Sequence, residues 1–351
     1  MALTADVRVH PELSGLVPGD GAAPGAHRRS RWSAALSYAL TVSLLLALNF
    51  FLPRSIPGDP ITSLTSEGSP NFVQDAATRA RLEAYYGLDR PLSDQFGRYL
   101  SDLAHGDLGV SIRYNVPVSA LVKERLPWTL LLIGSAMALA VGVGWAAGIH
   151  SAWKRGRGVD QGLLCAFLTV HSFPTFFVAS LTVLIFSVKL GWFPVAGART
   201  PFSHPSTAWR SALDVGHHLT LPAIVLALGF VAGDYLTMRA SMVGELEADY
   251  LLLGRAKGVS DRRLKYRYAA RNALLPTVTL SALQLGFAVT ESVVVETVFA
   301  YQGMGRLLFE AVSFRDYPVL AGCFLILSLI VVTLNFGADT LYRRLDPRTS
   351  K

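Results

Sequence analysis

Six long apolar stretches alternate with polar segments along this chain of 351 residues. A helix needs about 20 apolar residues to cross the hydrocarbon core of a bilayer, and each stretch is long enough for one crossing. Transmembrane β-strands would instead show alternating segments of about 10 residues, and the sequence has no such alternation. The pattern therefore predicts an all-α membrane protein with spans at Trp32–Leu52, Trp128–His150, Leu163–Leu190, Leu219–Met238, Ala273–Val298 and Val319–Thr340.

Polar segments divide the chain around these spans. Residues 1–31 are rich in Gly, Ala, Pro and Arg without helical periodicity, which is typical of a disordered tail. Residues 53–127 contain two short amphipathic stretches separated by glycine turns, so we expect helices at Ala76–Tyr86 and Ser93–Leu103 in a small subdomain. The predicted order is a tail (1–31), the first span (32–52), the subdomain (53–127), a core of five spans (128–340) and a second tail (341–351).

The polar segment between the fourth and fifth spans is too long to be a simple connector. Over residues 240–272 it contains two short helical stretches separated by Gly258, which suits the left-handed position that ends a helix. Ser260 can cap the second stretch, and Asp261 suits its positive N-terminal end. The pattern predicts a helix–glycine–helix elbow, a shape suited to docking another protein.

Basic residues gather on one side of this six-span arrangement. They precede the first span, follow the second, fill the elbow and follow the sixth, as Arg28, Lys154, Arg255 and Arg348 illustrate. The positive-inside rule makes this side cytoplasmic, with both termini there, and makes residues 53–127 extracytoplasmic. The formal net charge of +7 therefore reflects topology, because nucleic-acid binding would gather the basic residues on one soluble face.

Several polar residues lie at membrane depth, where each needs water or a partner. His171-Ser172-Phe173-Pro174 interrupts the third span, and Pro174 predicts a kink that fits either ordinary bending or a pore-lining break. Glu291 in the fifth span fits a pore-facing or a structural position equally, whereas Asp234 and Glu296 lie near span ends and are expected to pair or snorkel. The candidate pathway residues are His171, Ser172, Pro174, Gln284 and Glu291.

The sequence offers few candidate residues for catalysis or metal binding. Cys165 and Cys323 lie in separate predicted spans and are expected to pack as small apolar residues. An enzyme would need a nucleophile–base pair or a metal motif. A self-contained ATPase would need a Gly-x-x-x-x-Gly-Lys-Ser/Thr loop, and the glycine-rich Gly303-Met304-Gly305 segment is not followed by Gly-Lys. We therefore predict a protein that is not an enzyme, with no catalytic residues and no metal site.

Short turn and helix motifs follow one another in a specific order along most of the chain. They are Pro57–Pro60, Gly87–Pro91, Gly106–Ser111, Pro117-Val118, Ala256–Gly258, Arg271–Pro276, Gly303–Arg306, Arg315–Pro318 and Asp346–Arg348. Together they resemble the dipeptide/oligopeptide/nickel branch of binding-protein-dependent ABC importer permeases. The elbow departs from the generic signature, which has Glu-Ala-Ala where this chain has Leu252-Leu253-Gly254, and Tyr268 stands where the branch usually has a histidine.

This resemblance implies a fold, a location and partners. The fold would be that of a type I ABC importer permease with six transmembrane helices, in a bacterial or archaeal plasma (inner) membrane. A second permease subunit, expected to be a paralogue, would complete the pathway. Two ATPase subunits would dock beneath and use ATP and Mg²⁺, and an extracytoplasmic solute-binding protein would deliver the cargo. This chain would bind no cofactor itself.

The same resemblance makes the elbow the EAA loop, which grips the ATPase subunit. Leu251, Leu252, Ala256 and Val259 would then offer apolar contacts, and Arg255 and Lys257 would meet acidic groups. The predicted coupling residues are Asp249, Tyr250, Leu252, Arg255, Ala256, Lys257, Gly258 and Val259.

Small peptides are the expected cargo, moved by alternating access. A nickel pathway can use imidazole and thiolate ligands, which are scarce here at membrane depth, whereas the kink at Pro174 and polar Gln284 suit a wet, weakly selective passage. A permease for nickel or another solute stays an alternative, because a metal can cross as a chelate. A secondary transporter is disfavoured, because such folds often have inverted repeats and would leave the elbow without a role.

Overall fold

The computed structural model describes residues 31–55, 76–203 and 207–345. The predicted N-terminal tail up to residue 30, the Pro57–Pro60 turn and the Asp346–Arg348 motif lie outside these ranges. The chain divides into two units, residues 1–46 and 47–351. The described part of the first unit is the N-terminal portion of one helix, and every contact discussed below lies within the second unit.

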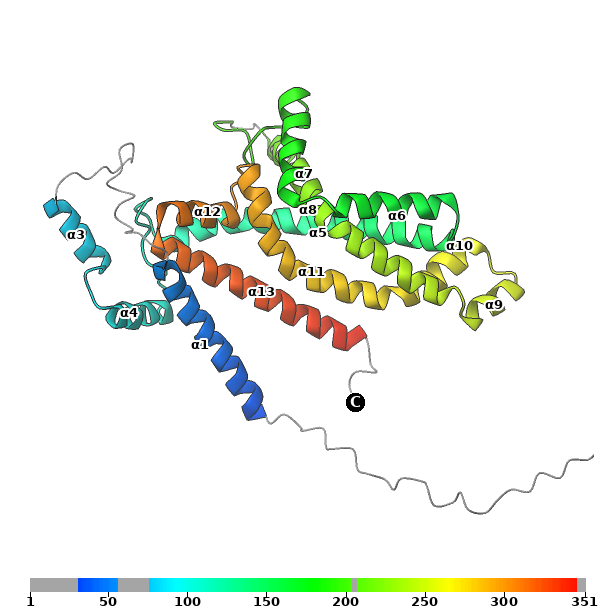
Figure 1. Ribbon diagram of the computed structural model, residues 1–351, viewed down its shortest axis with the longest axis horizontal. Helices are drawn as coiled ribbons and strands as arrows, with labels where there is room; N and C mark the ends of the chain where they lie inside the picture. The colour runs from blue at the N-terminus through cyan, green and yellow to red at the C-terminus, as the bar shows by residue number, and fades with distance from the viewer. Residues whose placement is uncertain (1–30, 56–75, 204–206, 346–351) are drawn as a thin grey trace, which may run out of the picture. The chain divides into compact units, whose positions relative to one another are not determined.

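Regular structure among the described residues is helical, apart from one isolated bridge between Val110 and Pro117, which confirms the all-α prediction (Figure 1). Two of the helices, η2 and η3, have the wider π geometry. In chain order the helices are α1 (Arg31–Ser55), α3 (Ala76–Tyr86), α4 (Leu92–Ala104), α5 (Val118–Trp153), α6 (Gly158–His171), α7 (Thr175–Thr182), η2 (Val183–Lys189), α8 (Ala208–Glu245), α9 (Asp249–Ala256), α10 (Asp261–Arg263), η3 (Leu264–Ala269), α11 (Ala270–Val298), α12 (Met304–Phe314) and α13 (Tyr317–Leu345).

Four described helices are long and apolar enough to cross a membrane, and they correspond to the second, fourth, fifth and sixth predicted spans. These helices are Val118–Trp153, Ala208–Glu245, Asp261–Val298 and Tyr317–Gly337. A fifth crossing arises if α6 and the α7–η2 segment count as one bent span. The first predicted span lies within the helix α1. Its apolar stretch, Val42–Ser55, is shorter than the four helices named above.

The predicted interruption of the third span is confirmed, and it is sharp. The axes before and after the break differ by 94°. Pro174 occupies the N-cap of α7 with a ψ of 137°, so the chain leaves helical geometry there and starts a new helix at Thr175. Proline has no amide hydrogen and crowds the preceding turn, which favours a break of the helix at this position.

Close packing of α5 against α8 forms the centre of the bundle. Gly144 and Gly148 lie on the α5 face that meets α8, where a Cβ on Gly144 would come within 2.7 Å of the Asp234 Cβ. A Cβ on Gly148 would lie 2.8 Å from the Tyr235 carbonyl oxygen. Small residues let membrane helices approach closely, and dispersion contacts then stabilise the pair. α11 packs against the same two helices and against α13.

The segment that precedes α5 contains the two predicted short helices, α3 and α4. α4 packs through Phe96 and Tyr99 on Phe50 at the end of α1, with ring centroids 5.1 and 5.5 Å apart. The Arg54 guanidinium adds a hydrogen bond of 3.2 Å from Nε to the Gln95 side chain and lies over the Phe50 ring. These contacts join the end of α1 to α4.

Asp316 anchors the loop before α5 to the start of α13. Its carboxylate accepts hydrogen bonds from the Ser111 hydroxyl at 2.5 Å and from the Ile112 and Arg113 amides at 3.3 and 3.1 Å. Burial raises the pKa of Asp316, although these donors favour its charged form. The Gly106–Ser111 and Arg315–Pro318 motifs therefore meet in space, more than 200 positions apart in the sequence.

Candidate coupling elbow and translocation cavity

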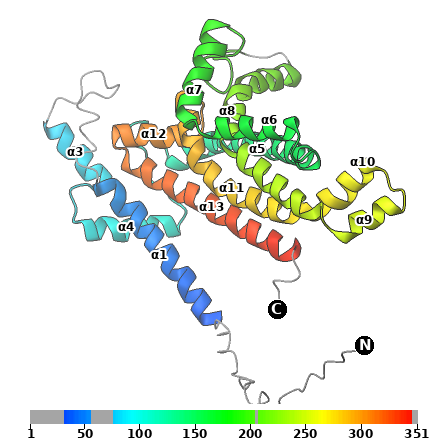
Figure 2. The same cartoon turned by 45° about the vertical axis from the view of Figure 1, so that its right-hand side comes forward.

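The elbow lies at the end of α8 and α11 that is opposite α12, as both views show (Figures 1 and 2). α9 ends in the pattern expected for a left-handed glycine: the Gly258 φ is +74°, the Val259 amide donates to the Gly254 carbonyl at 3.0 Å, and the Gly258 amide donates to the Arg255 carbonyl at 2.9 Å. This paired arrangement satisfies the last carbonyls of the helix. The helix end predicted at Gly258 is confirmed.

The second half of the elbow is not a separate helix. α10, η3 and α11 run on as one continuous helix, Asp261–Val298, so the elbow is directly connected to the fifth predicted span. Ser260 occupies the N-cap position but its side chain makes no capping hydrogen bond, which differs from the sequence prediction. The Ser260 carbonyl accepts the first backbone hydrogen bond of this helix, which the Leu264 amide donates at 3.0 Å.

A small apolar cluster fastens the elbow to the bundle. Leu251 of α9 and Leu264 of η3 are fully buried, together with Met238 and Met242 of α8. Gly254 allows this packing, since a Cβ there would lie 2.6 Å from Leu264 Cδ2. The departure from Glu-Ala-Ala thus places a glycine where the neighbouring helix leaves almost no room. The cluster therefore joins the elbow by direct contacts to the ends of α5, α8 and α11.

The outward face of α9 carries exposed apolar side chains. Leu252 is 67 % exposed and Leu253 is 56 % exposed, whereas Leu251 is fully buried. The sequence prediction that Leu251 offers an apolar docking contact is therefore wrong, and Leu253, which was not predicted, is available instead. A run of three leucines carries no periodicity, so no sequence signal could have separated the buried one from the exposed pair.

The remaining predicted coupling residues lie around this exposed pair. Asp249, Arg255, Ala256, Lys257 and Gly258 are exposed, while Tyr250 and Val259 are partly buried. The Tyr250 hydroxyl donates a hydrogen bond to the Glu245 carboxylate. Burial raises the pKa of Tyr250, and this hydrogen bond raises it further. The Arg255 guanidinium lies 6.0 Å from the centre of the Trp153 ring. Six of the eight predicted coupling residues, Leu252 included, are thus exposed.

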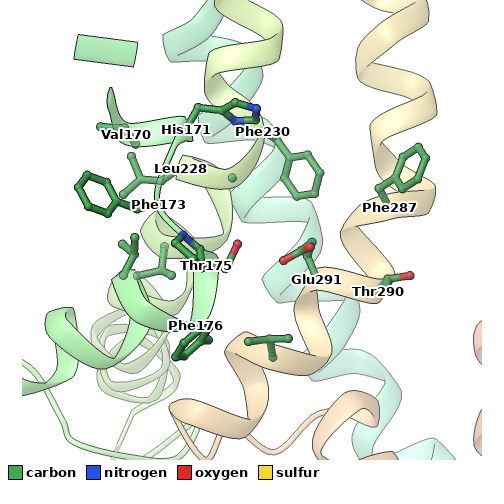
Figure 3. Close-up of a pocket in the computed structure, with 15 residues that line it drawn as sticks. Val170, His171, Phe173, Thr175, Phe176, Leu228, Phe230, Phe287, Thr290 and Glu291 are labelled. Carbon is green, nitrogen blue, oxygen red and sulfur yellow. The ribbon is translucent and has the colours of Figure 1, made fainter. Parts of the chain in front are cut away.

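A cavity of about 580 Å³ lies at the break between α6 and α7. Figure 3 shows its walls: residues of the break on one side, α8 behind, and α11 on the other side. Phe173, Phe176, Phe230 and Phe287 give it an aromatic lining, and Glu291 supplies a carboxylate. Of the predicted pathway residues, the structure brings His171, Pro174 and Glu291 together here.

Two predicted pathway residues lie elsewhere. The Ser172 hydroxyl donates to the Leu168 carbonyl at 2.8 Å, a bond within its own helix, and Ser172 does not line the cavity. Gln284 is buried where α11 meets α8, since its Nε2 atom would lie 2.8 Å from a Cβ on Gly233. Close by, the Ser281 hydroxyl donates to Asp234 at 2.5 Å. Gln284 thus belongs to the interface between α8 and α11 rather than to the cavity.

Comparison with known proteins places this arrangement in a family. The family model described as "Binding-protein-dependent transport system inner membrane component" matches residues 126–351. A putative peptide permease protein of Brucella suis biovar 1 is 39% identical over 314 residues, covering 88% of this chain and 95% of that protein. An oligopeptide transport system permease protein of Bacillus subtilis is 35% identical, covering 92% and 97%.

A di/tripeptide transport system permease protein of Pseudomonas aeruginosa is also similar, with 37% identity over 314 residues that cover 86% of this chain and 92% of that protein. These similarities extend well beyond the family model, into the segment that contains α3 and α4. The resemblance inferred from the sequence motifs is confirmed, and the chain belongs to the family of binding-protein-dependent transport system inner membrane components.

Proposed function

We propose that this chain is the permease subunit of an ATP-driven importer of small peptides, which it moves by alternating access. The names of the similar proteins support peptides as the cargo. The observation that carries the proposal is the cavity at the broken helix, because it combines a volume of about 580 Å³ with an aromatic lining and few polar groups. Such a lining accommodates variable apolar side chains without selecting one.

The proposed assembly contains a second permease subunit, two ATPase subunits and an extracytoplasmic solute-binding protein. ATP and Mg²⁺ act on the ATPase subunits, and this chain binds no cofactor itself. Leu252 and Leu253 would enter an apolar groove of the ATPase, while Arg255 and Lys257 would meet acidic groups at its rim. The exposure of these adjacent leucines on a short helix supports this role, since apolar side chains that are contiguous at a surface favour a protein interface.

Coupling would follow the continuous helix from α10 to α11. Closure of the ATPase pair would move the elbow, and the buried contacts of Leu251 and Leu264 would carry that motion into α8 and α11. Both helices line the cavity, through Phe230 and Glu291 among others. The same movement would thus change access to the cavity from one side of the membrane to the other.

We further propose six transmembrane helices with both termini in the cytoplasm. The first is α1 and the third is the bent pair of α6 with α7 and η2. Residues 53–127, including α3 and α4, then form the extracytoplasmic subdomain. The positions of basic residues before α1, after α5, in the elbow and after α13 support this orientation in a bacterial or archaeal plasma membrane.

Deletion of the gene tests the proposed cargo. The deletion strain should become resistant to toxic di- and tripeptides and should accumulate nickel at the normal rate. Reintroducing the gene should restore sensitivity, which excludes effects on neighbouring genes. Loss of nickel accumulation with unchanged peptide sensitivity would favour a nickel permease instead.

A further inference from the structure

Glu291 is the only acidic side chain among the described residues that line the cavity. It lies on α11 one helical turn from Phe287 and adjacent to Thr290, and Figure 3 shows its carboxylate directed toward the α7 side of the cavity. The opposite wall contributes Phe173 and Phe176, and α8 contributes Phe230. A carboxylate therefore projects into a space whose other walls are mainly apolar and include four phenylalanines.

The environment of Glu291 differs from that of two other acidic residues in the same bundle. Glu296 accepts hydrogen bonds from the Thr129 hydroxyl at 2.7 Å and the Arg306 amide at 3.1 Å. Asp234 accepts one from the Ser281 hydroxyl at 2.5 Å. Among the described residues, none donates a hydrogen bond to Glu291 or forms an ion pair with it. The chain thus provides partners for the two structural carboxylates and leaves Glu291 free in the cavity.

An ionised carboxylate at membrane depth is costly unless a cation or water compensates it. We propose that Glu291 receives the protonated amino terminus of a peptide that passes through the cavity, an inference that rests on the proposed peptide import. Unblocked peptides of every sequence carry this ammonium group. One carboxylate is therefore enough to recognise the feature that variable peptides share.

The aromatic walls suit the same ligand in two ways. Their faces attract an ammonium group through cation–π interaction, which strengthens the site around Glu291. They also offer apolar contact to the side chains that follow the amino terminus, without fixing their shape. A divalent metal fits less well, because among the described residues no group of three or more His, Cys, Asp or Glu is placed to hold one.

The test compares two cargoes in proteoliposomes that contain the complete importer and its binding protein. Alanyl-phenylalanine has the ammonium group, whereas propionyl-phenylalanine has the same shape without it. The readout is the initial uptake rate of the variant divided by that of the wild type, for each cargo. The binding protein is the same in both measurements, so its own preference cancels from this ratio.

Glu291→Gln should lower alanyl-phenylalanine uptake about tenfold and change propionyl-phenylalanine uptake less than about twofold, as for loss of one charge-assisted contact. Glu124→Gln is the matched control, because Glu124 is a 62 % exposed side chain away from the cavity, and it should change neither rate. If the wild type does not import the propionyl compound, Glu291→Lys provides the test of ammonium recognition. A positive charge at this position would repel the ammonium group, so alanyl-phenylalanine uptake should be lower than in Glu291→Gln.

Each other outcome has a defined meaning. Equal losses for both cargoes, in a complex that still assembles, would overturn ammonium recognition and indicate that Glu291 pairs with a cation of the second permease. Unchanged alanyl-phenylalanine uptake in Glu291→Gln or Glu291→Lys would also overturn ammonium recognition by Glu291. Failure of the assembled wild type to import any peptide would instead contradict the proposed function.

Discussion

The Thr129 hydroxyl donates a hydrogen bond of 2.7 Å to the buried Glu296 carboxylate, and it accepts one of the same length from the Met304 amide. Glu296 also accepts a hydrogen bond from the Arg306 amide, so its carboxyl group lies at the positive N-terminal end of α12. Gly303 and Gly305 leave space for this approach, because a Cβ on Gly303 would overlap the carboxylate. The glycines of the Gly303-Met304-Gly305 motif thus make room for a carboxyl group of the same chain at the start of α12.

Thr129→Val should destabilise the protein by about 1–3 kcal/mol, because the valine keeps the shape but leaves Glu296 and the Met304 amide without their shared hydroxyl. Thermal unfolding of the purified protein in detergent measures the effect. Thr129→Ser keeps the hydroxyl and should remain within about 1 kcal/mol of the wild type. Equal stability of the valine and serine variants would show that this hydroxyl contributes little.

The three consecutive leucines of α9 should separate into two classes. Leu251→Ala should lower the free energy of unfolding by about 2–5 kcal/mol, because it leaves a cavity in the cluster that fastens the elbow. Leu252→Ala and Leu253→Ala should change stability by less than about 0.5 kcal/mol, because both side chains are exposed. Thermal unfolding of the three purified variants provides this comparison.

The exposed pair should affect partner binding instead. In membranes that also contain the ATPase, Leu252→Ala and Leu253→Ala should each reduce co-purification of the ATPase several-fold, since each removes an apolar anchor. Normal co-purification from both variants would rule out this surface as the docking site.

Local signals predicted much of the fold. The helix at Ala76–Tyr86, the break at Pro174 and the left-handed Gly258 all depend on residues that are neighbours in the sequence. Proline and glycine restrict or permit backbone geometry directly, so their positions can be interpreted without tertiary information.

Other features of the site depend on neighbours from distant segments, which local sequence patterns do not reveal. Gln284 turns toward α8 because Gly233 leaves space for it, and nothing near Gln284 in the sequence reveals that space. Glu291 and Glu296 lie on one helix only five positions apart, yet the first faces the cavity and the second faces Thr129, 167 positions away. A helix turns by about 100° per residue, so five positions place two side chains on different faces.

Topology can be tested with single cysteines labelled by a membrane-impermeant reagent on intact cells. Cysteines at Ser101 in α4 and at Gln302, between α11 and α12, should react from outside. Cysteines at Arg28, Ser260 and Arg348 should react only after the cells are permeabilised, because the basic residues around them favour the cytoplasm. Labelling of Ser260→Cys from outside would contradict the proposed orientation, because the elbow would then lie outside the cytoplasm.

Gly258 provides the sharpest test of coupling. Gly258→Val forces a β-branched residue into a φ of +74°, a strain of about 1–3 kcal/mol that the exposed turn relieves by changing shape. The variant should still insert into the membrane, but peptide uptake and co-purification of the ATPase should both fall strongly.

A steric clash of the new side chain would not be the cause of this loss, because a Cβ at this position meets nothing within 4 Å. Gly258→Asn is therefore the matched control: asparagine tolerates the left-handed region and should retain most of both activities. If valine and asparagine behave alike, or if the valine variant transports normally, the conformation of Gly258 is not what couples the elbow to the ATPase.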